Sequence, residues 1–294
     1  MRARSLDWQS KLILLLVLPG TAVGVAYQAR SDASTSPAAL WWTLGLSVGL
    51  GLLAWLARAG TPAAAATGAL LTASLMFSTA YVPFSPWRTA LTPVLAFMVI
   101  TSAATRFGRA RKVRLGTAES KRGRSASQVS ANVGLATLAA LPAAQLWFEN
   151  SLGIRLYLGV PLFVPALAAL AEAAADTVSS EVGQVLGGRP FMLTTLRRVD
   201  PGTDGAISLA GTLAGIAAAA AVAAAGTWTC NGDLRMFLLN FTGAVFGLFF
   251  DSLLGATVER VGWLNNDSVN FLSTAGAAAF ALSLAAGFPH PGVG

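Results

Sequence analysis

The sequence predicts an all-α, polytopic integral membrane protein, and three observations support that fold class. Hydrophobic residues make up 54% of the 294 residues and charged residues only 11%, against roughly 25% charged residues in soluble domains. The apolar runs are about 17 to 23 residues long, the length that a helix needs to cross a bilayer and too long for a barrel strand. No linker composition separates the runs. We therefore expect residues 1–294 to form one membrane domain, a bundle of about nine transmembrane helices.

The first four spans are expected in the N-terminal third of the chain. Arg2, Arg4 and Lys11 precede an apolar run at residues 12–27. This run begins like a signal peptide but no convincing small-residue cleavage site follows it, so we expect it to remain as the first span. The second, third and fourth spans are predicted at residues 38–57, 62–81 and 87–105. Pro62 suits the first position of a helix.

Five more spans are expected after a basic stretch. They are predicted at residues 125–148, 156–175, 206–225, 234–256 and 269–287, with Pro161 and Pro165 kinking the second of these. Positive charge in a short loop favours the cytoplasm. We therefore expect the N-terminus and loops 106–124, 176–206 and 257–268 on the cytoplasmic side, with Cys230 and His290 outside. The expected location is a bacterial inner membrane with the active face in the cytoplasm.

The net charge of +7 does not indicate a nucleic-acid partner. The basic residues lie in short loops between spans, where charge sets orientation. We interpret the first half of the basic stretch, residues 106–114, as a surface for anionic lipid headgroups. A single cysteine, Cys230, excludes an intramolecular disulfide and a cysteine-based metal cluster. The expected surroundings are membrane lipids.

A polar helix face is expected directly after this basic stretch. Arg124 leads into a helix in which Ser125, Gln128 and Asn132 follow one another at steps of three and four, so they share one face. Polar side chains at membrane depth usually face the bundle interior, where they bind each other or a ligand. Both interpretations remain open for these residues.

Three carboxylates are the candidate metal ligands. Asp176 is expected near the cytoplasmic end of a span, and a charge in the bilayer centre costs roughly 2.5–3.5 kcal/mol, so it needs a cation or a basic partner. Glu181 lies about 140° round the same helix, so it could share an ion with Asp176 only if the helix breaks between them. Asp251 is expected at a similar depth. Magnesium takes one or two carboxylates together with phosphate oxygens.

Basic residues and a glycine turn near these carboxylates are typical of a polyphosphate site. Arg122, Arg124, Arg197 and Arg198 can each bind phosphate through two parallel hydrogen bonds. The turn at residues 201–205, PGTDG, can bring backbone amides close to an anion, although it is equally consistent with a plain turn.

Soluble nucleotide-binding folds are not expected. The chain has no Walker A sequence and no kinase glycine-rich loop with its partner motifs. The only histidine, His290, is expected on the opposite side of the membrane, so acid–base catalysis by histidine is not predicted. Phosphoryl transfer to a phosphate monoester does not need it, because that acceptor is largely ionised at neutral pH.

Several motifs resemble, in order and spacing, those of the membrane protein family DUF92, which includes animal transmembrane protein 19 and the plant phytyl-phosphate kinase. The resemblance covers residues 62–288, the family-like core, and leaves residues 1–60 as variable N-terminal spans. Val178 and Ala206 depart from the pattern, because the family often has Trp and Gly there. The matching motifs are Gly123-Arg124, Gln128 and residues 131–134; residues 175–177 and 180–183; residues 194–199, 201–205 and 208–209; and residues 251–256, 266–267 and 269–274.

The resemblance implies a prenyl-phosphate kinase. Such an enzyme converts an isoprenoid monophosphate, for example phytyl or geranylgeranyl phosphate, to the diphosphate, with CTP or ATP as phosphoryl donor and Mg²⁺ as cofactor. It implies catalytic roles for Asp176, Glu181, Arg197 and Asp251, the carboxylates also as metal ligands. It further implies nucleotide or phosphate binding by Arg122, Arg124, Gln128, Asn132, Ser180, Thr195, Arg198, Gly202, Thr203, Gly205, Ser208, Asn266, Asp267 and Asn270.

Two other functions remain open at this point. The stretches PGTDGAISL and GLFFDSLLGATVERVGWLNND loosely resemble motifs of membrane cytidylyltransferases, which would make the protein a CTP-dependent lipid nucleotidyltransferase. A lipid-phosphate transporter or scramblase would use the same arginines without catalysis.

Overall fold

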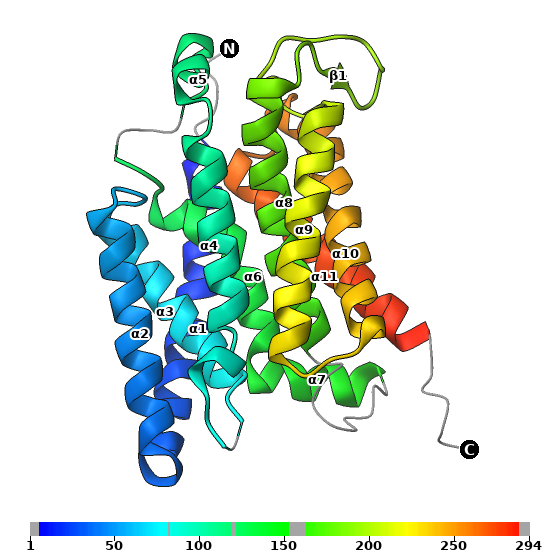
Figure 1. Cartoon of the computed structure of the whole chain (residues 1–294). Helices are drawn as coiled ribbons and strands as arrows, with labels where there is room; N and C mark the ends of the chain where they lie inside the picture. Colours follow the sequence, from blue (N-terminus) through cyan, green and yellow to red (C-terminus); the bar gives the residue numbers. More distant parts are fainter. Residues whose placement is uncertain (1–5, 82, 119–121, 153–162, 288–294) are drawn as a thin grey trace.

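A computed structural model describes residues 6–81, 83–118, 122–152 and 163–287. They form a helical bundle, which confirms the predicted fold class (Figure 1). The helices are α1 (Asp7–Thr35), α2 (Pro37–Leu56), α3 (Pro62–Ser78), α4 (Leu91–Arg106), α5 (Arg109–Leu115), α6 (Ala126–Ala140), α7 (Pro142–Leu152), α8 (Val164–Leu186), α9 (Leu209–Thr229), α10 (Leu234–Leu254) and α11 (Asn266–Gly287). A short 3₁₀ turn (Pro86–Arg88) precedes α4, a π-turn (Gly255–Glu259) follows α10, and strands β1 (Phe191–Met192) and β2 (Ala206–Ile207) pair antiparallel.

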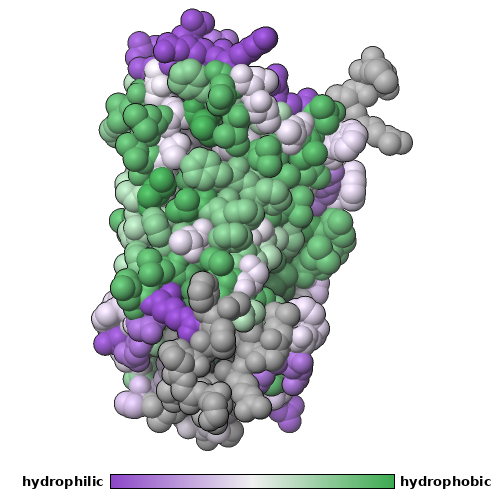
Figure 2. All heavy atoms as spheres, turned by 90° about the vertical axis from the view of Figure 1, so that its right-hand side faces the viewer, coloured by the Kyte–Doolittle hydropathy of each residue, from purple (hydrophilic) through white to green (hydrophobic). Residues whose placement is uncertain are grey.

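The two ends of the bundle differ in what they carry. The start of α1, the short helix α5 and the loop with β1 lie at one end, and α7 lies at the other with the end of α11 (Figure 1). An apolar band separates polar surfaces at the two ends on the face seen in Figure 2. This pattern is that of a protein whose middle lies in hydrocarbon.

Helix α8 forms the centre of the bundle. It contacts α4, α6, α9, α10 and α11, and every residue from Val164 to Ala175 is buried. Small residues let α9 approach closely: a Cβ atom on Gly215 would lie 2.7 Å from the carbonyl oxygen of Ala175. Close packing through glycine and alanine is typical of membrane helices. The carboxylates of α8 are therefore held in a crowded, rigid setting.

The structure gives a lower count of clear spans than the nine expected. Within the described residues, five helices are long and apolar enough to cross a membrane: α1, α2, α9, α10 and α11. The count rises to seven if two bent pairs, α4 with α5 and α6 with α7, each count as one span. Helix α3 is shorter, and α8 carries three carboxylates. Nine spans and a cytoplasmic N-terminus stay predictions.

Three predicted details differ from the structure. The span predicted at residues 125–148 is bent by 63° at Pro142, which begins α7. Helix α8 continues for ten residues past Asp176, so the first part of the predicted loop 176–206 is helical. Pro165 lies in the first turn of α8, where proline is tolerated, and it does not kink the helix; Pro161 lies outside the described residues.

Candidate active site

A polar cavity of about 290 Å³ lies at the end of the bundle that carries α5 and the β1 loop. Three stretches far apart in the sequence meet there: the start of α6, the second half of α8 with the loop that follows, and the junction of α10 with α11. From the residues predicted for the site, it is lined by Arg124, Gln128, Asn132, Asp176, Ser180, Glu181, Gly202, Thr203, Gly205, Ser208, Asp251, Asn266 and Asn270.

Two aspartates face each other across the cavity. Asp176 of α8 and Asp251 of α10 lie within hydrogen-bonding reach of each other's carboxyl group. The Oδ1 atom of Asp251 is buried and has no hydrogen-bond partner within the described part of the chain. Two carboxylates this close repel each other unless a proton or a cation lies between them. Arg124 supplies positive charge nearby.

The donor set of this pair fits a magnesium ion that is completed by other oxygens. Among the described residues, no group of three or more His, Cys, Asp or Glu side chains is arranged to hold a metal by itself. Magnesium usually keeps waters and takes only one or two carboxylates plus phosphate oxygens. Asp176 and Asp251, with the unpartnered oxygen of Asp251, meet that requirement.

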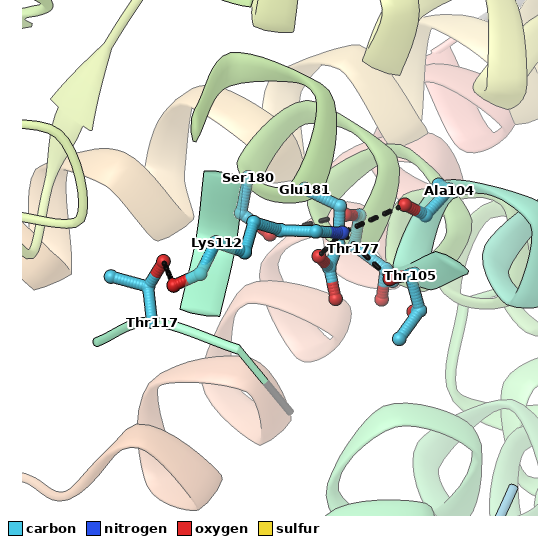
Figure 3. Close-up of polar contacts among 7 residues, drawn as sticks. All are labelled: Ala104, Thr105, Lys112, Thr117, Thr177, Ser180 and Glu181. Atoms are coloured by element: carbon cyan, nitrogen blue, oxygen red, sulfur yellow. Dashed lines mark hydrogen bonds and ion pairs between the residues drawn. The ribbon is translucent and has the colours of Figure 1, made fainter. Parts of the chain in front are cut away.

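Glu181, the third predicted ligand, has a different partner. Its Oε2 atom lies 2.5 Å from Nζ of Lys112 on α5 (Figure 3). Lys112 is 1% exposed and also donates to the carbonyl oxygens of Ala104 and Thr105, at 3.0 and 2.7 Å. Because α8 does not break between residues 176 and 181, Glu181 and Asp176 cannot share one ion in this conformation.

The Lys112 contact corrects the interpretation of residues 106–114 as a surface for lipid headgroups. Lys112 is buried, and a bend of 62° between α4 and α5 brings it to α8. The bend lies at Gly108, whose φ of 61° favours glycine. A Cβ atom at this position would also lie only 2.5 Å from the Val185 side chain. No feature of the sequence distinguishes the buried Lys112 from the exposed basic residues around it.

A glycine turn covers the cavity. Gly205 has a φ of 71° and packs against the backbone of Ala256, so closely that a Cβ would overlap the Ala256 nitrogen. This contact with the π-turn fixes residues 201–205 beside the cavity that Asp251 also lines. No backbone carbonyl among the described residues accepts a hydrogen bond from the N–H of Gly202 or Asp204. These N–H groups are therefore available to an anion.

The backbone holds Arg124 in place. Its N–H donates to the carbonyl oxygen of Ala59 at 3.0 Å, and its own carbonyl oxygen accepts from Thr61 at 2.9 Å. Ser125 then caps α6 through a capping box with Gln128. Asn132 donates to the carbonyl oxygen of Gln128 at 2.8 Å. Arg124 and the polar face of α6 thus enter the cavity from a fixed helix start.

Five predicted site residues lie outside the cavity. Arg197, Arg198 and Thr195 are exposed on the β1–β2 loop, where the Arg198 guanidinium lies 5.3 Å from the Phe191 ring centroid. Asp267 is buried and accepts a hydrogen bond of 2.6 Å from Ser10, which joins α11 to α1. Arg122 is exposed and does not line the cavity.

Other polar residues were not predicted for the site. Ser179, Gln184, Asp204 and Glu259 line the cavity. Glu172, one turn before Asp176 on α8, is 1% exposed, and its Oε1 atom has no partner among the described residues. The spacing of four between Glu172 and Asp176 places both carboxylates on one helix face, and this signal was available in the sequence.

Comparisons with known proteins show the family of this chain. The model of the family described as integral membrane protein DUF92 matches residues 45–278. An uncharacterized membrane protein of Synechocystis is 35% identical over 68% of this chain and 75% of its own length. An uncharacterized membrane protein of Methanocaldococcus jannaschii is 41% identical over 37% of this chain and 45% of its own length.

A plant protein is also similar. Protein VTE6, chloroplastic, of Arabidopsis thaliana is 30% identical over 61% of this chain and 54% of its own length. The chain thus spans about half the length of the archaeal and plant relatives. No solved structure matches the chain.

Proposed function

This chain belongs to the integral membrane family DUF92, and we propose that it is a prenyl-phosphate kinase. The enzyme would transfer the terminal phosphoryl group of CTP or ATP to an isoprenoid monophosphate such as phytyl or geranylgeranyl phosphate. The observation that carries the proposal is the composition of one cavity: a pair of facing aspartates, Arg124 and a glycine turn with available N–H groups. Phosphoryl transfer needs positioning and charge stabilisation more than it needs a base.

The roles of the residues follow from this composition. Asp176 and Asp251 would hold a magnesium ion, which would supply neutralising charge to the donor phosphates. The Arg124 guanidinium and the N–H groups of Gly202 and Asp204 would bind phosphate oxygens of the nucleotide. An oxygen of the lipid monophosphate forms a bond to the terminal phosphorus, the bond from that phosphorus to the bridging oxygen breaks, and the nucleoside diphosphate leaves.

The bilayer position of the cavity suits both substrates. It lies at one end of the bundle, and the polar surfaces at the bundle ends border an apolar band (Figure 2), so a lipid phosphate headgroup and a soluble nucleotide can both reach it. We place this end at the cytoplasmic face of a bacterial inner membrane, because the basic helix α5 lies there.

One experiment separates this proposal from its alternatives. Purified protein is incubated with magnesium, labelled CTP or ATP, and phytyl, geranylgeranyl or farnesyl monophosphate, and the products are separated. Nucleoside diphosphate together with lipid diphosphate is the expected result. Release of pyrophosphate would instead indicate a nucleotidyltransferase. An absence of turnover together with lipid-phosphate flux across liposomes would indicate a transporter.

A further inference from the structure

A second cavity, of about 480 Å³, lies beside the polar one. Its walls come from α2, α3, α4, α6 and α8. Glycine and alanine form one wall, with Gly51, Ala54, Ala64, Ala65 and Gly68, and larger apolar side chains form the other, among them Phe97 and Leu170. The volume lies within the range of roughly 300–1,000 Å³ that small-ligand pockets have. The lining is suited to hydrocarbon.

The mouth of this cavity is basic. Arg58, Arg106 and Arg109 line it and are exposed. Within the described part of the chain, none of these three guanidinium groups forms an ion pair with a carboxylate, so no carboxylate in contact neutralises them. Arginine binds phosphate through two parallel hydrogen bonds. The cavity therefore fits an amphiphile with an apolar tail and an anionic head.

The two cavities meet at two residues. Arg124 and Asn132 line both of them. A head group bound at the basic mouth would thus lie beside the cavity that contains Asp176 and Asp251. The turn between α2 and α3 also keeps the two cavities together, because Ala59 and Thr61 hold the Arg124 backbone.

We propose that the second cavity binds the lipid substrate, with one isoprenoid tail between α2, α3 and α4 and its monophosphate among Arg58, Arg106 and Arg109. The assignment of this lipid as the phosphoryl acceptor rests on the proposed kinase function. Binding of the lipid monophosphate itself does not depend on turnover.

Gly68 offers a way to block the cavity. Gly68 lines the cavity, and a Cβ atom built there meets no atom within 4 Å, so Gly68→Leu should direct its side chain into the cavity. Gly68 lies six residues after Pro62, roughly 9 Å along α3 from the mouth. A long tail should therefore be blocked and a five-carbon tail admitted. Gly49→Leu is the matched control, because Gly49 has equally open surroundings and lines neither cavity.

The test measures binding and kinetics separately. Labelled geranylgeranyl monophosphate is bound to the full chain in phosphatidylcholine nanodiscs without nucleotide. We expect Gly68→Leu to weaken this binding at least tenfold and Gly49→Leu to change it less than twofold. In turnover assays, Gly68→Leu should raise KM for geranylgeranyl monophosphate at least tenfold, while KM for the nucleotide and for isopentenyl monophosphate changes less than twofold.

A second variant keeps the proposal testable if Gly68→Leu does not fold. Arg106→Gln with Arg109→Gln should weaken binding of geranylgeranyl monophosphate at least tenfold and leave binding of uncharged geranylgeraniol unchanged. Equal loss for both ligands would overturn the assignment of the phosphate to the mouth. Equal competition by phosphatidic acid would assign the cavity to bulk phospholipid and would also overturn the proposal.

The outcomes distinguish this inference from the kinase proposal. If the variants lose lipid binding as expected but no nucleotide gives turnover, the cavity assignment stands and the kinase function fails. If the wild-type protein catalyses the kinase reaction and Gly68→Leu binds lipid and reacts like the wild-type protein, the kinase function stands and the cavity assignment fails. Absence of any binding of geranylgeranyl monophosphate to the wild-type protein overturns the cavity assignment.

Discussion

Helix α8 carries carboxylates in two contrasting environments only five residues apart. Glu181 has a buried cation, Lys112, which is further held by two backbone carbonyls. Asp176 instead faces a second carboxylate, Asp251, one of whose oxygens has no partner among the described residues. In the first pair the positive charge of Lys112 neutralises Glu181, whereas the second pair brings two carboxyl groups together. The difference indicates that Lys112–Glu181 holds the fold together and that Asp176–Asp251 binds something from outside it.

The largest effect is expected at Asp176. Asp176→Asn removes a carboxylate oxygen from the site but keeps the shape of the side chain, so we expect turnover to fall at least a hundredfold, because groups that stabilise charge in the transition state contribute on that order. Thermal unfolding in detergent should stay near that of the wild-type protein, and stabilisation by magnesium nucleotide should disappear. A variant that unfolds, or one that keeps wild-type turnover, would contradict the ligand role.

Glu181→Gln should show the opposite pattern. It leaves the buried Lys112 ammonium without its counter-charge, and removing one partner of a buried pair costs about 3–5 kcal/mol in soluble proteins. We expect a clear fall in unfolding temperature, with residual turnover in the folded fraction. The double variant Glu181→Gln with Lys112→Met should recover most of the stability. If Glu181→Gln alone were as stable as the wild-type protein, the structural role of Glu181, and with it the contrast with Asp176, would be contradicted.

A smaller effect is expected at the glycine turn. Gly205→Ala adds a Cβ that overlaps the Ala256 backbone at a φ of 71°, so the turn must move from its place at the cavity. Gly188→Ala is the control, because Gly188 has a similar φ of 62° but no atom within 4 Å of a built Cβ. We expect both variants to lose about 1 kcal/mol from backbone strain, and only Gly205→Ala to raise KM for the nucleotide, by roughly tenfold. Equal KM values would exclude a role for the turn.

The smallest effect is expected for labelling of Cys230, where almost no reaction should occur from either side of the membrane. Cys230 is 3% exposed, and burial raises the pKa of its thiol to about 12. Maleimides react with the thiolate, and at pH 7 to 8 a pKa this high leaves very little of it. Rapid labelling in the folded protein would contradict the buried position.

Introduced cysteines would then show which end of the bundle faces the cytoplasm. Thr195→Cys lies on the exposed β1–β2 loop, at the end with the polar cavity, and Asn150→Cys is exposed on α7 at the other end. We expect reaction of the first only from the cytoplasmic side and of the second only from outside. The reverse pattern would place the polar cavity outside the cell.

The sequence predicts the presence of the helices better than the residues at which they end or the contacts that they make. Spans α2, α9, α10 and α11 are close to their predicted positions because long apolar runs are set by bilayer thickness. The predicted span at residues 156–175 ends at Ala175 because polar residues follow it in the sequence. The helix continues to Leu186 because those polar residues line a cavity and do not face water.

The predicted site residues divide in a similar way. The cavity collects residues whose chemistry and order are visible along the chain, such as Asp176, Asp251 and the turn at 201–205. Arg197 and Arg198 share that chemistry but lie on the exposed side of the β1–β2 hairpin, and strand pairing cannot be inferred from two residues per strand. The apolar cavity is lined by small residues such as Gly68, beside which a Cβ would meet empty space, so it leaves no motif in the sequence.

The position of Arg124 has a consequence for how two ligands would affect each other. Arg124 lines both cavities, and its backbone is hydrogen-bonded to the α2–α3 turn. An anion in either cavity therefore alters the electrostatic potential felt by an anion in the other. Thermodynamic linkage makes this coupling free energy reciprocal: a nucleotide that changes lipid affinity by some factor has its own affinity changed by the same factor. Arg124 would then couple the affinities of the two substrates.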